Sequence, residues 1–385
     1  MTRTHAFAIF IPVVLVIYGS INAYIFVRGF QTVPQSSALR PWFVAIFWVV
    51  ALSYIAARFL ERVAPSSATN GLIWIGSFWL GAMAYFFIII VVIDFARLVN
   101  YFLPFFPGFI TRNIQYAKQI TAFVVTGIVL LVLIVGRINQ AFPRVRTIEI
   151  AIHKKSPIKE LNVALATDIH LGTIVCNSHF MRIVNKINSL HPDIVLFAGD
   201  IVDEDIAPVI RQNLGDTLQL IHSKYGTYGI TGNHEYIGGV EIACTYLESH
   251  GINMLRDRSV KVDNAFTLVG REDRSIDRMN GVHRKDLHAL MWDVDGSLPV
   301  ILMDHQPFNL DDAVRNNIDL QLSGHTHDGQ LWPFNFITNR IYELSYGYMM
   351  KGNTQFYVSC GVGTWGPPIR TSGRPEVVNI RLKFD

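Results

Sequence analysis

Four long apolar runs dominate the first third of the chain. A helix needs about 20 apolar residues to cross the hydrocarbon core of a bilayer, and each run is near that length. Helices of a soluble bundle would show a polar face with a period of about 3.6 residues, and the stretch FFIIIVVI shows none. A cleaved signal peptide would explain only the first run. The pattern therefore predicts an all-α, four-helix transmembrane domain over residues 1–146, with spans at Ala6–Val27, Trp42–Phe59, Leu72–Phe95 and Ile120–Val135.

Basic residues in the short connections predict how these helices are oriented. Lys and Arg are more frequent in cytoplasmic loops than in loops on the other side. One side carries Arg3, Arg58, Arg62, Arg137, Arg144, Arg146, Lys154, Lys155 and Lys159. The other carries Arg28, Arg40, Arg97, Arg112 and Lys118. The chain is therefore expected to be a multi-pass protein of the inner, cytoplasmic membrane, with both termini and the following domain on the cytoplasmic side.

From Thr147 onwards the pattern changes to short apolar runs that end in polar loops. The runs are LNVALATDIH, PDIVLFAGD, YGTYGITGNHE, PVILMDHQP, IDLQLSGHTH and QFYVSCGVG, and helical patterns separate some of them. Strands that are apolar along their whole length are typical of sheets covered on both faces. Residues 147–385 are therefore predicted to form an α/β domain.

Composition and charge agree with this division. Of the 385 residues, 50% are hydrophobic and only 16% are charged, which is more apolar than an ordinary soluble protein. The net charge of +3 gives no case for nucleic-acid binding. Cys176, Cys244 and Cys360 are far apart and odd in number, which predicts free thiols rather than disulfides or a zinc site.

Five of the predicted strands end in a loop that carries Asp, Asn or His. Ligand sites in open α/β sheets form outside the carboxyl ends of strands, so these loops are expected to converge. A lone histidine is usually a satisfied core residue, whereas five such placements predict a site. Imidazole, carboxylate and amide ligands without thiolate favour Mn²⁺, Fe²⁺, Co²⁺ or Zn²⁺ over Ca²⁺ and Mg²⁺. The residues are Asp168 and His170, Asp200, Asn233 and His234, His305, and His325 with His327.

The blocks DIH, GDIVD, GNHE, DHQP and GHTH, in this order, resemble the calcineurin-like metallophosphoesterase superfamily. The resemblance runs from Leu161 to the C-terminus and implies a four-layer αββα sandwich with two divalent ions, Mn²⁺ first among them, at the strand ends. It implies one ion held by Asp168, His170, Asp200 and His327. The second would be held by Asp200, Asn233, His305 and His325, with Asp200 shared.

The resemblance also implies roles for residues beside the ligands. His234 matches the catalytic imidazole, which stabilises the transition state or protonates the leaving oxygen. Asp203 matches the carboxylate that orients His234, and a loop cap is the alternative for it; Glu235 is expected to be structural. Two ions about 3.5–4 Å apart bind phosphate oxygens and lower the pKa of a bridging water, so that hydroxide becomes the nucleophile. The expected activity is metal-dependent hydrolysis of a phosphoric ester or anhydride.

Three features bear on the substrate. A domain tethered to a bilayer favours amphiphilic phosphates. The stretch GQLWPFNFI puts Trp332, Phe334 and Phe336 beside the site, where they either touch acyl chains or the bilayer, or pack under the loop. The segment GVGTWGPPIRTSGRPEVVNIRL resembles the C-terminal signature of the YkuE-like and UDP-2,3-diacylglucosamine pyrophosphatase subgroup. Arg370 in that segment either reaches a phosphate or anchors a turn.

The expected function is therefore cleavage of a phosphodiester or pyrophosphate bond in a lipid-linked or nucleotide-linked substrate, with UDP-2,3-diacylglucosamine as the first candidate. A phospholipid or nucleotide phosphodiesterase is the enzymatic alternative. The non-enzymatic alternative is a scaffold that keeps the fold without turnover, and such a scaffold would lack ligands or the catalytic histidine.

Overall fold

The computed structural model describes residues 3–279 and 281–385, and these form two compact units. One unit holds the helices up to Arg137 together with Gly366–Ile369. The other comprises Ile138–Trp365 and Arg370–Asp385.

Long helices make up the first unit. Within the described residues, four helices are long and apolar enough to cross a membrane: α1, α2, α3 and α5. At most 17% of the residues in each of these spans are buried within the protein, so most of their apolar side chains face outwards. Ser66 caps α3 by accepting a hydrogen bond from the backbone N–H of Thr69 at 3.1 Å. The helices are α1 (Arg3–Phe30), α2 (Arg40–Val63), α3 (Ser67–Phe102), α4 (Gly108–Arg112) and α5 (Ile114–Ala141).

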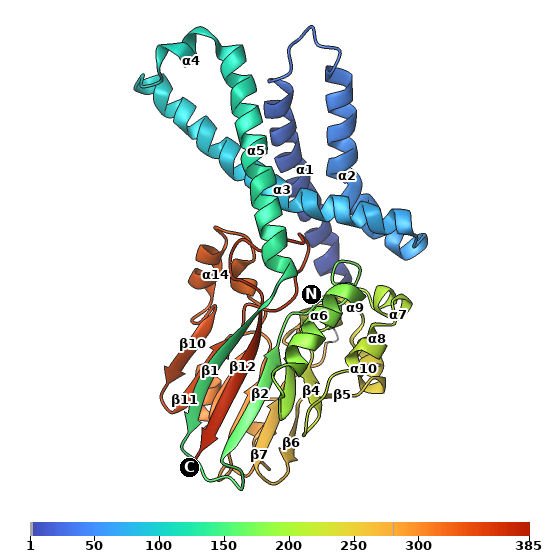
Figure 1. Ribbon diagram of the computed structural model, residues 1–385, viewed down its shortest axis with the longest axis vertical. Helices are drawn as coiled ribbons and strands as arrows, with labels where there is room; N and C mark the ends of the chain where they lie inside the picture. The colour runs from blue at the N-terminus through green and yellow to red at the C-terminus, as the bar shows by residue number, and fades with distance from the viewer. Residues whose placement is uncertain (1–2, 280) are drawn as a thin grey trace. The chain divides into compact units, whose positions relative to one another are not determined.

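Two six-stranded sheets form the centre of the second unit (Figure 1). The first has the order β1-β12-β2-β3-β4-β5, and the second has the order β10-β11-β9-β8-β7-β6. In each sheet the strands that lead to the polar loops are parallel neighbours: β2, β3 and β4 in the first, β8 and β9 in the second. The strands are β1 (Arg144–Ile152), β2 (Glu160–Ala166), β3 (Ile194–Ala198), β4 (Thr227–Ile230), β5 (Ile252–Met254), β6 (Arg258–Val262), β7 (Phe266–Gly270), β8 (Val300–Met303), β9 (Leu320–Ser323), β10 (Gly347–Lys351), β11 (Thr354–Val358) and β12 (Glu376–Phe384).

Helices cover the outer face of each sheet. On the first sheet α6 buries Phe180, Ile183, Val184 and Ile187, a spacing that repeats along one helix face. The helices of this unit are α6 (Asn177–Asn188), α7 (Ala207–Arg211), α8 (Leu214–Leu218), α9 (Asn233–Gly238), α10 (Val240–Ser249), α11 (Ser275–Met279), α12 (Leu287–Leu290), α13 (Asp311–Arg315) and α14 (Asn335–Ile341), with a 3₁₀ turn η1 (His327–Gly329).

Alternation along each strand explains the layers. In β2, Val163 and Leu165 enter the core between the two sheets, whereas Ala164 and Ala166 face the helices. Successive strand side chains point to opposite faces, so strands buried on both faces must be apolar at every position. The predicted four-layer αββα sandwich, preceded by four long apolar helices, is confirmed. Cys176, Cys244 and Cys360 are free thiols, as predicted.

Candidate metal centre

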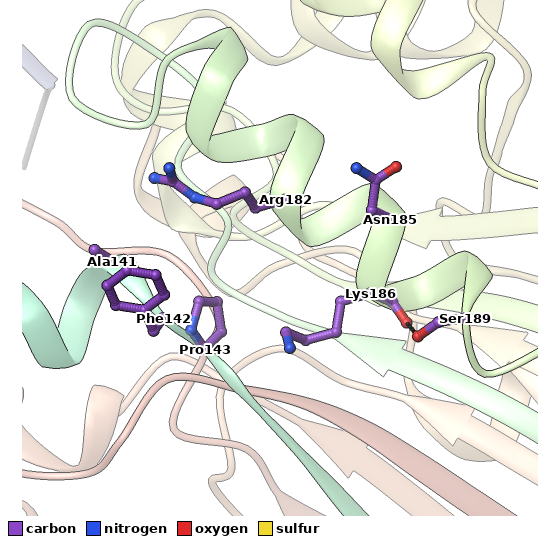
Figure 2. A pocket seen from close by; sticks show the side chains of 7 residues that line it. All are labelled: Ala141, Phe142, Pro143, Arg182, Asn185, Lys186 and Ser189. Atoms are coloured by element: carbon purple, nitrogen blue, oxygen red, sulfur yellow. Dashed lines mark hydrogen bonds between the residues drawn. The ribbon is translucent and has the colours of Figure 1, made fainter.

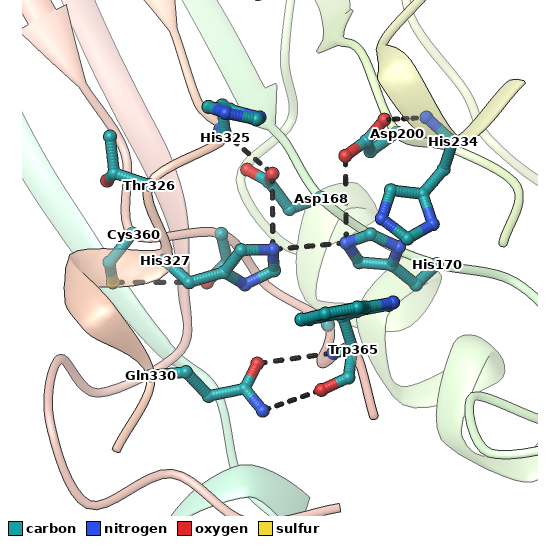
Figure 3. Close-up of polar contacts among 12 residues, drawn as sticks. Asp168, His170, Asp200, His234, His325, Thr326, His327, Gln330, Cys360 and Trp365 are labelled. Carbon is teal, nitrogen blue, oxygen red and sulfur yellow. Dashed lines mark hydrogen bonds and ion pairs between the residues drawn. The ribbon is translucent and has the colours of Figure 1, made fainter. Parts of the chain in front are cut away.

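The polar loops that follow β2, β3, β4, β8 and β9 meet at the carboxyl ends of these strands. Three groups of acidic and imidazole side chains there each have ligand atoms within 4.8 Å of one another. Figure 3 shows several of these side chains, among them Asp168, His170, Asp200, His234, His325 and His327. The groups are Asp168, His170 and His327; Asp200, His305 and His325; and His170, Asp203 and His234.

Several buried atoms in this cluster have no hydrogen-bond partner. They are Asp168 Oδ2, His170 Nδ1, Asn233 Oδ1 and His305 Nε2. Buried polar atoms are nearly always hydrogen-bonded, so each exception needs an explanation. Among the described residues, four such atoms from three separate loops lie here, as expected for metal ligands without their cation.

Asp200 lies between two of the groups. Its Oδ2 is 3.1 Å from His305 Nε2 and 3.9 Å from His170 Nε2, so one carboxylate oxygen faces a member of each. Apart from this contact with the Asp200 carboxylate, His305 Nε2 has no hydrogen-bond partner. The geometry suits a carboxylate shared by two cations.

The distance between His170 and His327 also fits a cation. Their Nε2 atoms are 3.1 Å apart, and Asp168 Oδ1 is 3.5 Å from His327 Nε2. Bonds of roughly 2.0–2.1 Å from one ion to each nitrogen would separate the nitrogens by roughly 3.0–3.4 Å. Without a cation or a proton between them, two imidazole lone pairs would repel at this distance.

The protonation of three members of the cluster, His325, His327 and Asp200, favours metal ligation. Burial, and then His305, lower the pKa of His325 to about 4. Burial, and then Arg370, hold the pKa of His327 well below its usual value. Burial opposes the charge of Asp200, but His305 and His234 outweigh it and hold the pKa of this carboxyl well below its usual value. Neutral imidazoles and an ionised carboxylate are the forms that bind metals.

His305 is oriented by the sheet beside it. Its Nδ1–H donates to the carbonyl of Ala198, the last residue of β3, at 2.8 Å. A ligating histidine usually donates its other ring N–H in this way, which fixes the tautomer and presents the second nitrogen to the ion. His305 Nε2 is therefore the atom that faces Asp200.

Glycines before the ligand blocks make room for the ligands. A Cβ on Gly199 would lie 2.4 Å from His305 Nδ1, and the backbone there has φ +90°. A Cβ on Gly324 would lie 2.3 Å from Asp168 Oδ2. Gly199 is needed because its backbone has a positive φ and because a side chain would collide with His305, whereas Gly324 is needed because a side chain would collide with Asp168.

Comparison with known proteins agrees with this geometry. The family pattern of the calcineurin-like phosphoesterases matches residues 161–329. An uncharacterised metallophosphoesterase of Campylobacter jejuni is 30% identical, and the match covers 98% of this chain and 99% of that protein. The chain belongs to the calcineurin-like phosphoesterase family.

Two other relatives match a smaller part of this chain. One is a Danio rerio protein described as a transmembrane protein with a metallophosphoesterase domain, 31% identical over 70% of this chain. Another, an uncharacterised metallophosphoesterase of Helicobacter pylori, is 34% identical over 63% of this chain. The matches span 63% and 64% of these relatives' own lengths. Among solved structures, a dimetal phosphatase from Danio rerio covers 58% of this chain at 12% identity with a TM-score of 0.36.

His234 and Asp203 form a hydrogen-bonded pair beside the ligands. His234 Nδ1 donates to Asp203 Oδ1 at 3.0 Å, and the backbone N–H of His234 donates to Asp200 Oδ1 at 2.9 Å. Burial opposes the charge of the imidazole, but Asp200 and then Asp203 outweigh it and raise the pKa of His234 to about 9. The hydrogen bond to Asp203 and the raised pKa suit His234 to proton donation. Asp203 has the position that an orienting carboxylate requires.

Glu235 ties two ligand loops together. Its carboxylate accepts hydrogen bonds from the backbone N–H groups of Asp200 at 3.2 Å, Val202 at 2.8 Å and Gly232 at 2.7 Å. The side chain is fully buried. The sequence predicted only a structural role for Glu235, and these bonds explain it: one carboxylate holds the loop of GDIVD against the loop of GNHE.

Arg370 is fully buried beneath the GHTH loop. Its guanidinium donates to the carbonyl of His327 at 2.8 Å, to His327 Nδ1 at 2.9 Å and to the carbonyl of Gly363 at 2.8 Å. This geometry matches the anchoring alternative rather than the phosphate-binding one. Arg370 positions His327.

The aromatic residues around the loop are exposed rather than packed under it. Trp332 is 54% exposed and Phe334 is 36% exposed. Trp365, which sequence reasoning missed, lies with its ring 5.7 Å from that of His234 (Figure 3). Gln330 holds the backbone of Trp365, accepting from its N–H at 3.2 Å and donating to its carbonyl at 2.7 Å. The lone tryptophan in GTWGPP was the available signal.

None of these histidines lines the pocket of about 350 Å³ that Figure 2 shows. No His, Asp or Glu lines it, so hydrolysis cannot occur there through the groups described above. Its lining consists of Ala141, Phe142, Pro143, Arg182, Asn185, Lys186 and Ser189.

Proposed function

We propose that this metallophosphoesterase is a membrane-anchored hydrolase that uses two divalent cations to cleave a phosphodiester or pyrophosphate bond in a lipid-linked substrate. The observation that carries the proposal is the set of buried, unpartnered ligand atoms around Asp200, among them Asn233 Oδ1 and His305 Nε2. A scaffold without turnover has no reason to keep such costly atoms unsatisfied.

Two sets of side chains would hold the cations, with Asp200 shared. When bound, the cations supply Lewis-acid stabilisation of the phosphate and an activated water. Mn²⁺ is the first choice for this set of imidazole, carboxylate and amide ligands, and Fe²⁺, Co²⁺ and Zn²⁺ are the others. The first set is Asp168, His170, Asp200 and His327, and the second is Asp200, Asn233, His305 and His325.

The chain's own residues would then move the proton and exclude water. His234, protonated below a pKa of about 9, is the acid that donates to the leaving oxygen. Asp203 holds the ring through Nδ1, which leaves Nε2 to face the substrate. Trp365, beside the ring of His234, keeps bulk water from one side of it.

The membrane anchor rests on the four long apolar helices and on relatives described as transmembrane. The excess of Lys and Arg at both ends of the helical part favours a cytoplasmic catalytic domain. A reporter fused after Asp385 would be active in the cytoplasm, and a signal from the opposite side would reverse the orientation.

The lipid-linked substrate is supported by apolar residues that follow the GHTH loop. Trp332, Phe336, Ile337 and Ile341, on and before α14, are each more than half exposed. Together with Phe334 they would contact acyl chains while the phosphate is bound by the cations. UDP-2,3-diacylglucosamine remains the first candidate, and a phospholipid or nucleotide phosphodiester is the alternative outcome of the same assay.

The test is hydrolysis by the full-length protein in detergent after chelation and reloading with Mn²⁺. We expect turnover of bis-p-nitrophenyl phosphate that is lost with chelator and restored by Mn²⁺. We also expect kcat/KM for UDP-2,3-diacylglucosamine at least tenfold above that for a soluble UDP-sugar. Hydrolysis that does not respond to metal would refute the proposed chemistry, and equal rates on lipid and soluble substrates would refute the lipid preference.

Matched tryptophan variants separate lipid contact from general effects. Trp332→Ser should lower the ratio of kcat/KM for the lipid substrate to kcat/KM for the soluble UDP-sugar several-fold. Trp292→Ser, at a site that is 79% exposed on another part of the same unit, should leave the ratio unchanged.

A further inference from the structure

Three arginines lie around the buried carboxylate of Asp304, the residue that follows β8. Arg271 Nη1 donates to Asp304 Oδ2 at 3.1 Å, and Arg284 Nη1 donates to Asp304 Oδ1 at 3.0 Å. Each carboxylate oxygen of Asp304 is therefore already paired with an arginine. The third arginine, Arg274, shares this environment without a carboxylate of its own.

Among the described residues, Arg274 has no carboxylate within ion-pair distance. Asp312, the other carboxylate that acts on it, is paired with Arg315. The guanidinium of Arg274 lies over the ring of Phe308, 5.2 Å from its centre, and is partly exposed. Burial, and then repulsion from Arg284, lower the pKa of Arg274. A positive charge in these surroundings is stabilised when an anion arrives.

A row of aromatic rings connects Arg274 to the metal centre. The ring of Phe308 lies 4.6 Å from that of Tyr342, and Tyr342 lies 6.1 Å from His325. Phe308, Tyr342 and His325 are all partly exposed. A substrate bound by its phosphate near His325 would therefore have an aromatic surface beside it and a guanidinium at the far end.

We propose that Arg274, Phe308 and Tyr342 form a subsite for a second anionic group of the substrate, separated from the scissile phosphate by a sugar-sized or nucleoside-sized spacer. The proposal rests on the proposed function, because it assigns the substrate of that same centre two anionic groups. It favours the phosphodiester alternative over UDP-2,3-diacylglucosamine, whose two phosphates are adjacent. A planar guanidinium binds phosphate through paired hydrogen bonds, and aromatic faces pack against a flat spacer.

The alternative is that Arg274 only packs on Phe308, as many exposed arginines do on aromatic rings. Packing alone predicts a loss that is the same for every substrate. Recognition of an anion predicts a loss that depends on whether the second charge is present. A pair of substrates that differ in one remote phosphate distinguishes the two.

The experiment compares the 4-nitrophenyl ester of thymidine 5′-phosphate with the same ester carrying a 3′-phosphate. For the wild-type, Mn²⁺-loaded full-length protein we expect kcat/KM at least tenfold higher with the 3′-phosphate. Arg274→Gln should reduce that ratio to about one, and Arg274→Lys should restore part of it. Arg278→Gln, at an exposed arginine four residues further along the chain in α11, should leave the ratio unchanged.

Equal losses on both esters in Arg274→Gln, or a wild-type ratio near one, would overturn the subsite. Equilibrium binding of thymidine 3′,5′-bisphosphate and thymidine 5′-phosphate to the same proteins gives a readout that needs no turnover. If neither ester is hydrolysed but Arg274 still sets the preference for the bisphosphate, the proposed function fails and the subsite stands. If the esters are hydrolysed and the preference is absent, the subsite fails alone.

Discussion

Replacing His234 by Gln is expected to lower kcat by about 10²–10⁴-fold, the usual contribution of a positioned acid or base. The metal content should change little, because no ligand is removed and the backbone N–H that binds Asp200 is kept. Steady-state kinetics with metal analysis of the same sample measure both. His283→Gln, at an exposed histidine, is the control.

The pH profile tests the same residue through its partner. Asp203 raises the pKa of His234, so the protonated, active form persists to higher pH and activity is lost as pH rises through that pKa. Asp203→Asn removes the negative charge, so the loss should occur at lower pH than in the wild type. An unshifted alkaline limb, or a His234→Gln variant with near-normal kcat, would contradict the acid role.

Replacing Glu235 by Ala is the substitution expected to cost most stability. It leaves the backbone N–H groups of Asp200, Val202 and Gly232 buried without an acceptor. Each such group costs on the order of 1–3 kcal/mol, so the total is at least about 3 kcal/mol. For a unit of this size that corresponds to a fall in Tm of roughly 6–12 °C, measured by thermal unfolding of the full-length protein.

Glu241→Ala is the matched control, because Glu241 is exposed and pairs with Arg256 at the surface. Exposed pairs contribute at most about 1 kcal/mol, so its Tm should stay within a few degrees of the wild type. A Glu235→Ala protein as stable as this control would show that the carboxylate does not hold the two loops together.

The sequence predicted the strands that are buried on both faces. The six apolar runs became β2, β3, β4, β8, β9 and β11, and the loops after five of them meet as expected. The glycine, carboxylate and histidine blocks were visible because each sits next to such a run. The local pattern of apolar and polar residues was sufficient to predict the site wherever one short stretch contains both the strand and the ligand residue that follows it.

Features that depend on distant parts of the chain were not predicted. β1 alternates between exposed and less exposed positions and pairs in parallel with β12, where Ile148 lies opposite Ile380. Arg370 was left with two roles because only the folded chain brings it under His327. Nothing in the sequence around Arg274 indicates that Asp304 is already paired with two other arginines.

The most direct test of a centre built on a shared Asp200 is the number of ions bound per chain. Full-length protein that has been chelated and reloaded with Mn²⁺ should hold two ions in the wild type. His305→Gln should lose chiefly one of them, whereas Asp200→Asn should weaken both. An Asp200→Asn protein that still binds two ions with wild-type affinity, or loses only one as His305→Gln does, would contradict the shared carboxylate.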